Sequence, residues 1–401
     1  MKENILIVHN YYQVPGGEDT VVANEKRMLE ENGHNVILYE RDNSELKTYS
    51  VARKMLLPIT TIFNLKTYND IRKIILKHRI DVVHVHNTFN IISPAVYYAG
   101  VSMKVPVVQT VHNFRLMCPG ATFYRNNNVC EECCEKGLFC SVKYGCYRGS
   151  KIQTLACAIG TQIHRFTGIY KKIHYICLTE FNKRKLLQQG QIADKQISIK
   201  PNFGRENGNI IPFSKRKSQI VYVGRLDELK GIKILLKTWK RIEESSSAGD
   251  LELVVCGTGP LFDWCADYIS KNSLSKIVLK GHLPNAEAIK LIGESKAIIL
   301  PTQWYEGFPM TIIEAASVGT PVIGSDIGNV GSVIQNGVNG YKFAPNDDKE
   351  LQRIILTENL DLVDNVYALF REKYTKEVNY QQLLNCYREA RKNEKEYIRN
   401  N

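Results

Sequence analysis

The sequence lacks the features that mark membrane-spanning, secreted or dinucleotide-dependent proteins. No run reaches the ~18 apolar residues that a membrane span requires, and the first residues, MKENILIVHN, do not have the layout of a signal peptide. No G-x-G-x-x-G follows the first apolar run, which argues against a dinucleotide oxidoreductase. We therefore expect a cytoplasmic protein.

Cysteine is not scarce, but a reducing compartment argues against a disulfide framework for the eleven cysteines. Six of them gather in the segment 118–146. Cys130 and Cys133 have zinc-knuckle spacing, and Cys118 with Cys146 could complete a tetrahedral set. We expect a cysteine-rich insert that either holds a structural zinc ion or carries reduced thiols, with a disulfide as the third alternative.

The length and the charge distribution indicate two different domains. A chain of 401 residues exceeds the size at which one hydrophobic core stops growing. Residues 1–200 hold 27 Lys and Arg against 16 Asp and Glu, whereas residues 201–401 hold 26 against 25. The basic half suggests an anionic partner, namely a membrane surface, a phosphorylated carrier or nucleic acid. Surplus surface lysine for solubility is the alternative.

Apolar β-branched runs alternate with segments of helical period in both halves, a pattern that predicts βαβ units and parallel sheets. Because the runs are apolar on both faces, we expect helices on both sides of each sheet. The predicted class is α/β, with an N-terminal domain at 1–204, a C-terminal domain at 205–374 and a final helix at 375–401 that packs back on the first domain. The runs lie at 5–10, 35–40, 81–87, 106–113, 174–179, 219–226, 251–257, 276–281, 297–302 and 321–326.

Two segments of the basic half, 47–63 and 151–173, are both amphipathic and rich in Lys and Arg. Such a segment can lie on an anionic lipid surface. Ordinary core-facing helices have the same pattern, so both interpretations stay open.

The stretch EGFPMTIIE, residues 306–314, follows an apolar run and leads into a helical segment. Ligands of open α/β sheets bind at such strand ends. Pro309 suits a first helical turn, and the amides of Phe308, Met310 and Thr311 could face an anion or sugar hydroxyls. Glu314 would reach a vicinal diol from the helix. The alternative is that both glutamates are solvated.

Residues near the ends of the first-half strands form a second candidate site. Gly16 and Gly17 would let the backbone approach a ligand, or form a plain tight turn. The acidic pair that follows would repel a phosphate, which favours an acceptor or sugar here. His84 and His86 share one side of a strand; His84 reads as a core histidine and His86 could line a cleft. No third metal ligand is evident for this pair.

Several motifs in order along nearly the whole chain resemble the family 4 (group 1) retaining glycosyltransferases of GT-B fold. They are VPGGED, HVHN, TVHNFR, TEFNKRKL, VGRLDELKG, GTGP and the E-x7-E of EGFPMTIIE. The resemblance implies two Rossmann-like domains facing each other across a cleft. It also implies roles: Glu314 for the donor ribose, Glu306 with the amides of Gly307 to Met310 for the transferred sugar, Arg225 and Lys230 for the diphosphate, and His112 for the donor sugar.

The function that the resemblance implies is retaining transfer of a hexosyl-type sugar from a UDP- or GDP-type donor. The acceptor is a glycan or lipid-linked glycan of cell-surface polysaccharide, and the enzyme is peripheral at the inner face of the plasma membrane. No cofactor is expected for catalysis. A nucleotide-sugar epimerase or hydrolase of the same fold is one alternative. A nucleic-acid-binding protein is another, but the interleaved aromatics of such proteins are missing, so we expect no nucleic acid partner.

Overall fold

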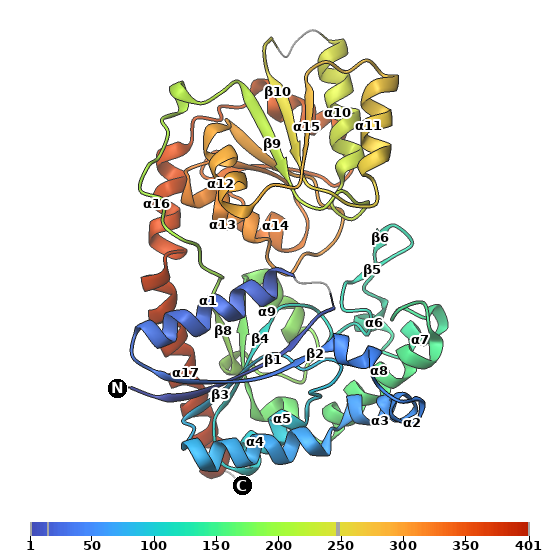
Figure 1. Ribbon diagram of the computed structural model, residues 1–401, viewed down its shortest axis with the longest axis vertical. Helices are drawn as coiled ribbons and strands as arrows, with labels where there is room; N and C mark the ends of the chain where they lie inside the picture. Colours follow the sequence, from blue (N-terminus) through green and yellow to red (C-terminus); the bar gives the residue numbers. More distant parts are fainter. Residues whose placement is uncertain (1, 14–15, 246–248, 400–401) are drawn as a thin grey trace. The chain divides into compact units, whose positions relative to one another are not determined.

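The computed structural model describes residues 2–13, 16–245 and 249–399, so Val14 and Pro15 of the VPGGED motif lie outside the described residues. The chain divides into two units (Figure 1). Unit 1 comprises residues 1–125, 130–201 and 379–401, and unit 2 comprises 126–129 and 202–378. Each unit is an α/β domain built on one six-stranded parallel sheet, as the strand pattern predicts.

The sheet of unit 1 has the order β2-β1-β3-β4-β7-β8. The order changes direction between β1 and β3, and polar loops follow the carboxyl ends of both strands. Its strands are β1 (Asn4–Tyr11), β2 (Asn35–Asp42), β3 (Val82–Asn87), β4 (Val107–Val111), β7 (His174–Cys177) and β8 (Ile197–Ile199). Its main helices are α1 (Gly17–Glu31), α4 (Leu65–His78), α5 (Ala95–Ser102), α8 (Lys151–Phe166) and α9 (Glu180–Leu187).

The sheet of unit 2 has the order β11-β10-β9-β12-β13-β14, with the change of direction between β9 and β12. Its strands are β9 (Gln219–Val223), β10 (Glu252–Cys256), β11 (Ile277–Gly281), β12 (Ala297–Leu300), β13 (Val322–Ser325) and β14 (Gly340–Phe343). Its helices are α10 (Ile232–Glu244), α11 (Phe262–Lys271), α12 (Asn285–Glu294), α13 (Met310–Ser317), α14 (Gly328–Val333), α15 (Asp348–Thr357) and α16 (Val363–Lys373).

The strands are buried to different degrees across each sheet. The central strands β3, β4 and β12 are buried throughout. The edge strand β2 is partly exposed along its length, and β11 has alternating exposed positions. Each edge strand has a neighbour on one side only, so one row of its side chains and backbone groups reaches solvent.

The final helix, α17 (Lys376–Arg399), belongs to unit 1 from Asn379 onward. Its sequence is mostly polar, but Leu383, Cys386, Tyr387 and Ala390 are buried. Their spacing places them on one face of the helix, and this face completes the core of unit 1. No helix among the described residues is long and apolar enough to cross a membrane.

The cysteine-rich insert contains short elements, and it packs against α8 of unit 1. Cys133 and Leu138 of the insert are buried together with Ala158 of α8. Helix α8 therefore forms one side of the small core of the insert. Its elements are β5 (Tyr124–Arg125), β6 (Asn128–Val129), α6 (Glu132–Glu135) and α7 (Cys140–Tyr144).

Candidate functional site

Two loops of unit 2 carry the residues predicted to bind the donor. One loop follows β9 and contains Arg225 and Lys230; the other follows β12 and contains Glu306. β9 and β12 are parallel neighbours, with Ile220 opposite Ala297, so both loops leave the same carboxyl edge of the sheet. The strand order changes direction between these two strands, which is where open α/β sheets bind ligands.

Lys230 and Glu306 form an ion pair at this edge. The Nζ atom of Lys230 lies 2.6 Å from Oε2 of Glu306, across a sequence separation of 76 residues. Glu306 is buried, which contradicts the alternative that it is a solvated glutamate. The structure therefore brings together two residues that the sequence assigned to the diphosphate and to the sugar.

Arg225 lies on the same loop as Lys230, with its side chain more exposed to solvent. Its Nε atom is 3.3 Å from Oδ2 of Asp227, and Oδ1 of Asp227 accepts a hydrogen bond from the amide of Lys230 at 3.0 Å. The hydroxyl of Tyr222, a buried β9 residue, donates to the carbonyl oxygen of Arg225 at 2.8 Å. Asp227 and Tyr222 thus fix the backbone that presents both cations.

A close backbone contact holds the two loops together at Gly231. Gly231 has φ +72°, and a Cβ atom there would lie 1.8 Å from the carbonyl oxygen of Pro301. The amide of Gln303 donates to the carbonyl oxygen of Leu229 at 2.8 Å. Only glycine has both the conformation and the space for this contact, so Gly231 determines how near Lys230 lies to the β12 loop.

The EGFP segment is fixed from the far side by Asn329 of α14. The Nδ2 group of Asn329 donates to the carbonyl oxygen of Glu306 at 2.6 Å and also to that of Gly307. Phe308 is buried, and Pro309 is the N-cap residue of α13. The helix therefore begins with the amides of Met310 and Thr311, where its dipole favours negative charge.

Glu314 lies on α13, beyond its first turn. Its Oε1 atom accepts a hydrogen bond of 2.7 Å from Nδ2 of Asn285. Burial raises the pKa of Glu314, while the hydrogen bond from Asn285 acts in the opposite direction. A half-buried carboxylate with one amide partner can accept further hydrogen bonds, as a diol would offer.

In unit 1 the first candidate residues lie where β1 leads into α1. Gly16 is the N-cap residue of α1, its amide donates to Oδ2 of Asp19 at 2.9 Å, and Oδ1 of Asp19 is 2.8 Å from Nε2 of His9. The backbone of Gly16 is extended, and a Cβ atom there would meet nothing within 4 Å. Open space, and not backbone strain, is therefore what glycine provides at this position; Gly17 begins the helix.

The histidines of β3 and of the loop after β4 form a row in which His84 and His86 are buried and His112 is partly exposed. Nδ1 of His86 lies 2.9 Å from Nε2 of His112, with the two rings stacked. His84 uses both ring nitrogens, with Nδ1 2.9 Å from the hydroxyl of Tyr387 and Nε2 2.8 Å from Oγ1 of Thr110. The prediction that His84 is a satisfied core histidine is confirmed. Burial lowers the pKa of His84 to about 4 and that of His112 to about 3, so both rings are neutral near pH 7.

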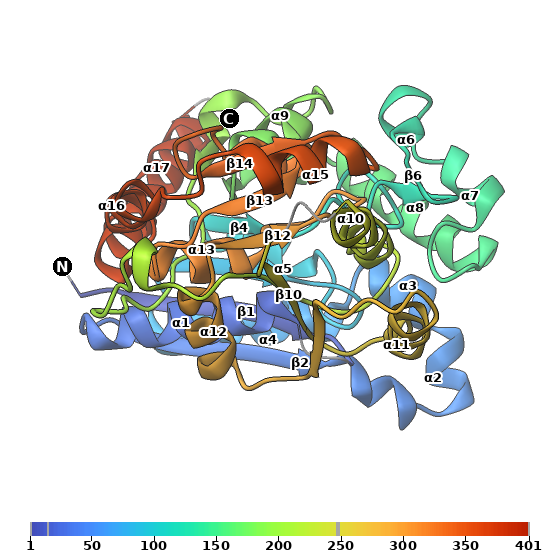
Figure 2. The same cartoon turned by 90° about the horizontal axis from the view of Figure 1, so that it is seen from above.

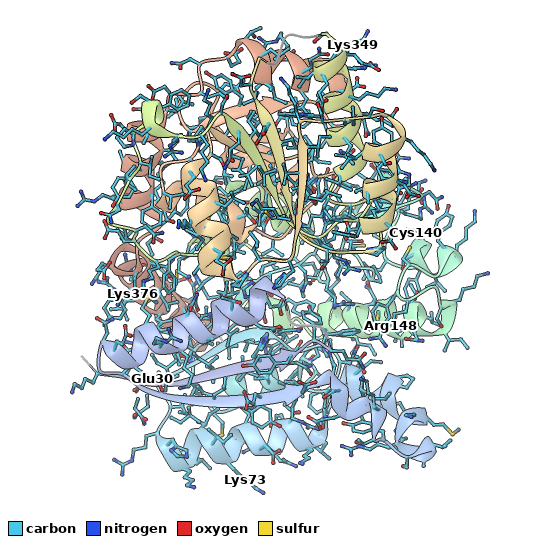
Figure 3. All side chains as sticks on the ribbon, turned by 45° about the horizontal axis from the view of Figure 1, so that its top comes forward. Glu30, Lys73, Cys140, Arg148, Lys349 and Lys376 are labelled. Carbon is cyan, nitrogen blue, oxygen red and sulfur yellow. The ribbon has the colours of Figure 1, made fainter. Side chains whose placement is uncertain are left out.

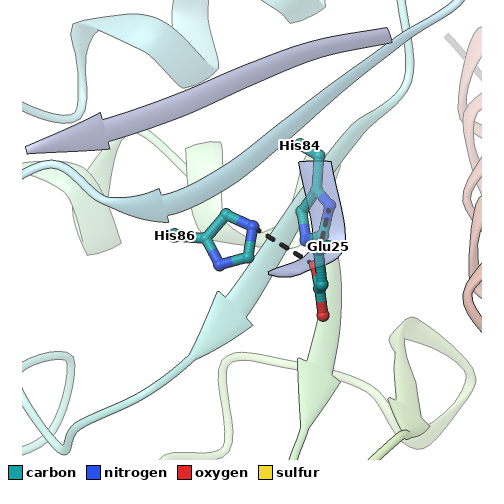
Figure 4. A group of neighbouring side chains, drawn as sticks. All are labelled: Glu25, His84 and His86. Carbon is teal, nitrogen blue, oxygen red and sulfur yellow. Dashed lines mark ion pairs between the residues drawn. The ribbon is translucent and has the colours of Figure 1, made fainter. Parts of the chain in front are cut away.

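Glu25, His84 and His86 form the one group of three metal-ligating side chains found among the described residues (Figure 4). This group does not fit a metal ion. The ammonium of Lys200 already lies 2.6 Å from Oε1 of Glu25, and all three of its members are buried. A divalent cation would face that ammonium at close range, and His84 would have to give up a hydrogen bond to bind it. The group is a charge-compensated polar core.

The pair of Glu25 and Lys200 was not predicted from the sequence. Both side chains are completely buried, and Lys200 also lies 3.1 Å from Oδ1 of Asn379 on α17. Lys200 directly follows β8, and Glu25 lies on a helix with charged neighbours. Nothing in the local sequence distinguishes these two residues from solvated ones.

A cavity of unit 1 opens beside the histidine row. His86 and His112 line it, together with Asn113 and Arg115 from the loop after β4. The guanidinium of Arg115 lies 3.8 Å from the ring centre of Phe89 in a cation–π contact. The cavity combines neutral imidazoles, an amide and a guanidinium, groups that hydrogen-bond to a polar ligand.

The zinc set predicted from cysteine spacing is not assembled. Cys118, Cys130, Cys133 and Cys146 do not appear among groups of metal-ligating side chains gathered within 4.8 Å in the described part of the chain. Instead Sγ of Cys133 lies 3.7 Å from Sγ of Cys140. The thiol of Cys133 hydrogen-bonds to Cys118 and lowers the pKa of Cys118 to about 6. The two sulfurs recorded close together are therefore those of Cys133 and Cys140, and spacing did not indicate Cys140.

Two family models match the chain. "Glycosyltransferase Family 4" matches residues 15–129, and "Glycosyl transferases group 1" matches residues 205–361. The second match contains Arg225, Lys230, Glu306 and Glu314, and the first contains His86 and His112.

Relatives of known name are similar over different shares of the chain. Glycogen synthase of Mycobacterium tuberculosis is 32% identical over 142 residues, and the match spans only 34% of either protein. The lipopolysaccharide 1,6-galactosyltransferase of Escherichia coli K12 is 28% identical over 43% of this chain and 49% of its own. The Escherichia coli enzyme named UDP-Gal:alpha-D-GlcNAc-diphosphoundecaprenol alpha-1,3-galactosyltransferase is 24% identical over 77% of this chain and 74% of its own.

Solved structures share the fold over the whole chain. The lipopolysaccharide outer core galactosyltransferase WaaB, in its apo form, superposes with a TM-score of 0.64 at 17% identity and covers 96% of this chain and 98% of its own. HepE of Anabaena, solved in complex with UDP and glucose, superposes with a TM-score of 0.62 at 15% identity over 96% and 98%. With both family models matched in order and the fold shared throughout, the chain belongs to the group 1 (family 4) glycosyltransferases of GT-B fold.

Proposed function

We propose that this protein is a retaining hexosyltransferase that uses a nucleotide-diphosphate sugar as donor and a glycan or lipid-linked glycan as acceptor, in the synthesis of cell-surface polysaccharide. The observation that carries the proposal is the ion pair of Lys230 and Glu306 at the strand switch of unit 2. The names of the Escherichia coli galactosyltransferases support the pathway, and the UDP complex of HepE supports a UDP-type donor over a GDP-type one.

The donor is held by unit 2. Lys230 and Arg225 bind the diphosphate, since two cations on one fixed loop match its charge. Glu306 accepts hydrogen bonds from hydroxyls of the transferred sugar, and Glu314 accepts those of the ribose. The amides of Gly307 to Thr311 surround the sugar and phosphate at the start of α13.

Transfer proceeds on one face of the sugar. The bond between the anomeric carbon and the phosphate oxygen breaks, and a bond to the acceptor oxygen forms on the same face. The acceptor hydroxyl proton passes to the departing phosphate oxygen, so no carboxylate nucleophile is needed. Arg225 and Lys230 stabilise the charge that grows on the nucleoside diphosphate, and this stabilisation provides the catalytic effect without a divalent cation.

Unit 1 binds the acceptor. The cavity beside His86 and His112 offers hydrogen-bonding groups for a sugar, and Asp19 beside Gly16 disfavours a phosphate at that position. His112 is neutral near pH 7, so it can hydrogen-bond to the donor sugar, the role that the family resemblance implies, without adding charge. We propose that the enzyme works in the cytoplasm as a peripheral protein of the inner membrane face.

A nucleotide-release assay over a panel of nucleotide sugars tests the proposal. We expect one donor to be consumed rapidly only when acceptor is present, and we expect Lys230→Ala and Glu306→Ala to abolish this consumption. Wild-type rates in either variant would contradict the proposed site. Release that is equally fast without acceptor would instead favour the nucleotide-sugar hydrolase or epimerase.

A further inference from the structure

Helix α8 of unit 1 presents an apolar stripe to solvent. Ile152 and Phe166, near its two ends, are 77% and 92% exposed. Thr154, Ala158 and His164, on the other side of the helix, are buried. Surface helices normally show polar residues to water, whereas on α8 Leu155, Ile159 and Ile163, between the two ends, are also 36% to 42% exposed. The exposed members of the stripe are Ile152, Leu155, Ile159, Ile163 and Phe166.

Two short helices, α2 (Val51–Met55) and α3 (Leu57–Ile62), extend this apolar surface. Helix α3 packs beside α8 (Figures 1 and 2). Nε2 of His164 bonds to the carbonyl oxygen of Ile62 at 3.0 Å, and Gly160 leaves room for the side chain of Ile62. The exposed apolar residues of α2 and α3 are Val51, Met55, Leu56 and Ile59, with Val51 and Met55 about three quarters exposed. We call residues 51–59 and 152–166 together the docking face.

The chain around the docking face is free of acidic residues. Residues 46–69 contain four Lys and Arg, residues 136–179 contain seven, and neither segment contains Asp or Glu. Four cations are exposed beside the apolar residues: Arg53, Lys54, Arg148 and Lys151. Arg148, which precedes α8 in the sequence, is labelled in Figure 3. Apolar side chains bordered by cations are the pattern of helices that lie in the interface of an anionic bilayer. A protein surface would have to supply both an apolar patch and a ring of carboxylates.

A groove opens on the docking face between α2, α3 and α8. The groove is lined by three cations, Lys47, Lys54 and Arg148, and by apolar side chains that include Leu57 and Ile152. Thr61, Phe89, Ala156 and Cys157 line both this groove and the cavity that contains His86 and His112. A phosphate-bearing head group at a bilayer surface would therefore enter this groove beside cations, and the groove continues toward the proposed acceptor cavity.

We propose that the docking face binds an anionic phospholipid bilayer, with the α8 stripe and the apolar residues of α2 and α3 in the interface and the surrounding Lys and Arg at the lipid phosphates. The purpose of this contact, the delivery of a lipid-linked acceptor, rests on the function proposed above. The binding itself does not.

Co-sedimentation of the full chain with vesicles tests the proposal. Vesicles of phosphatidylcholine are compared with vesicles that contain phosphatidylglycerol in addition. We expect binding to the anionic vesicles at least about tenfold stronger than to the neutral ones, and weakened by salt. The double variant Ile159→Asp/Phe166→Asp and the double variant Lys54→Glu/Lys151→Glu should each lower the affinity about tenfold or more.

The matched control is Leu76→Asp. Leu76 is 67% exposed on α4 of the same unit, outside the docking face, and this variant should bind vesicles like the wild type. Because all substituted positions are exposed, the variants should keep the wild-type melting temperature. Equal binding of wild type to both kinds of vesicle, or full binding by the stripe variant, would overturn the proposal. A dimer that the stripe variant dissociates, without vesicle binding by the wild type, would also overturn it in favour of a second copy.

The two proposals fail in different assays. Binding of UDP-glucose and other nucleotide sugars, followed by thermal shift without vesicles, uses none of the residues substituted in the stripe variant and should be unchanged in it. If the wild type binds nucleotide sugars but does not bind anionic vesicles, the docking face is contradicted and the proposed donor site is not. Vesicle binding without any donor binding or transfer would contradict the proposed function only.

Discussion

The ammonium nitrogen of Lys230 lies 2.6 Å from a carboxylate oxygen of Glu306. Each residue neutralises the other at the strand switch of unit 2. In the proposed donor complex, the diphosphate pairs with Lys230 and the sugar hydroxyls hydrogen-bond to Glu306. These two contacts replace the ion pair. The pair therefore keeps two charged groups in position before the donor binds.

Replacing either member of this pair should remove activity without removing the fold. We expect Lys230→Met and Glu306→Gln each to lower the rate of sugar transfer by about 100-fold or more, because charge stabilisation of the leaving group or positioning of the sugar is lost. Partly exposed ion pairs contribute little to stability, so the melting temperature should change little. Lys233→Met is the control, since Lys233 lies on α10 and pairs with Glu228; full activity of Lys230→Met would disprove the assignment.

The buried pair of Glu25 and Lys200 should be essential for the stability of unit 1. Lys200→Met leaves the carboxylate of Glu25 buried without its ammonium, which typically costs about 3–5 kcal/mol. The double variant Glu25→Gln/Lys200→Met removes both charges and should recover part of that loss. Urea unfolding of the wild type, Glu25→Gln, Lys200→Met and the double variant measures the coupling. Additive losses in the double variant would show that the pair does not interact.

Stability should fall as the solution becomes acidic below pH 6.5. Burial lowers the pKa of His84, His164 and His174 to about 4, from the ordinary value of 6.5. The unfolded chain therefore takes up protons first as the pH falls, so the stabilisation is complete above pH 6.5 and is lost progressively toward pH 4. Each histidine contributes roughly 1.4 kcal/mol per pH unit in this window.

Unfolding in urea at pH 7.5, 6.5 and 5.5 measures this slope. His164→Gln should reduce the pH dependence of the unfolding free energy by about the contribution of one histidine, since glutamine does not titrate. Equal free energies of unfolding at pH 7.5 and pH 5.5 in the wild type would contradict the neutral buried histidines.

Substitution of Gly231 separates two effects on stability, namely the steric clash of a new Cβ atom and the strain of a positive φ angle. Gly231→Ala meets a positive φ of +72° and also a carbonyl oxygen 1.8 Å from the new Cβ atom, whereas Gly168→Ala meets nearly the same φ of +70° in open space. We expect Gly168→Ala to cost about 1 kcal/mol and Gly231→Ala clearly more. Donor binding should also weaken only in Gly231→Ala, because that clash separates the two loops. Equal unfolding free energies would exclude the contact.

Structural zinc in the cysteine-rich insert stays a prediction. The 3.7 Å between the sulfurs of Cys133 and Cys140 is close to the edge of a zinc–thiolate tetrahedron, roughly 3.8 Å for Zn–S bonds of about 2.3 Å. Elemental analysis of the purified protein tests it: about one zinc ion per chain, lost in Cys133→Ser, would support zinc over reduced thiols or a disulfide, the alternatives that the sequence leaves open. Cys157→Ser, on α8, is the control and should retain it. Metal-free wild-type protein with freely titrating thiols would disprove zinc binding.

The two parallel sheets and the EGFP loop could be predicted because their signals are local. Apolar runs such as the one that contains Leu300 predict buried strands. Because the strands of each sheet are parallel, the loops that follow them lie at the same edge of the sheet. Glu25 and Lys200 could not be predicted, since their pairing joins residues 175 apart and charged residues in isolation read as solvated. The outward apolar side of α8 was equally hidden, because an amphipathic pattern does not reveal which side faces water.

The chain leaves unit 1 at Pro201 and returns to it at Asn379. Tyr387 and Asn379 on α17 are the partners of His84 and Lys200, so the N-terminal core keeps unsatisfied polar groups until α17 arrives. During synthesis on the ribosome, unit 2 emerges and can fold before the N-terminal unit is finished, although that unit was made first. Truncation before α17 should thus leave unit 2 able to fold while unit 1 keeps buried polar groups without their partners.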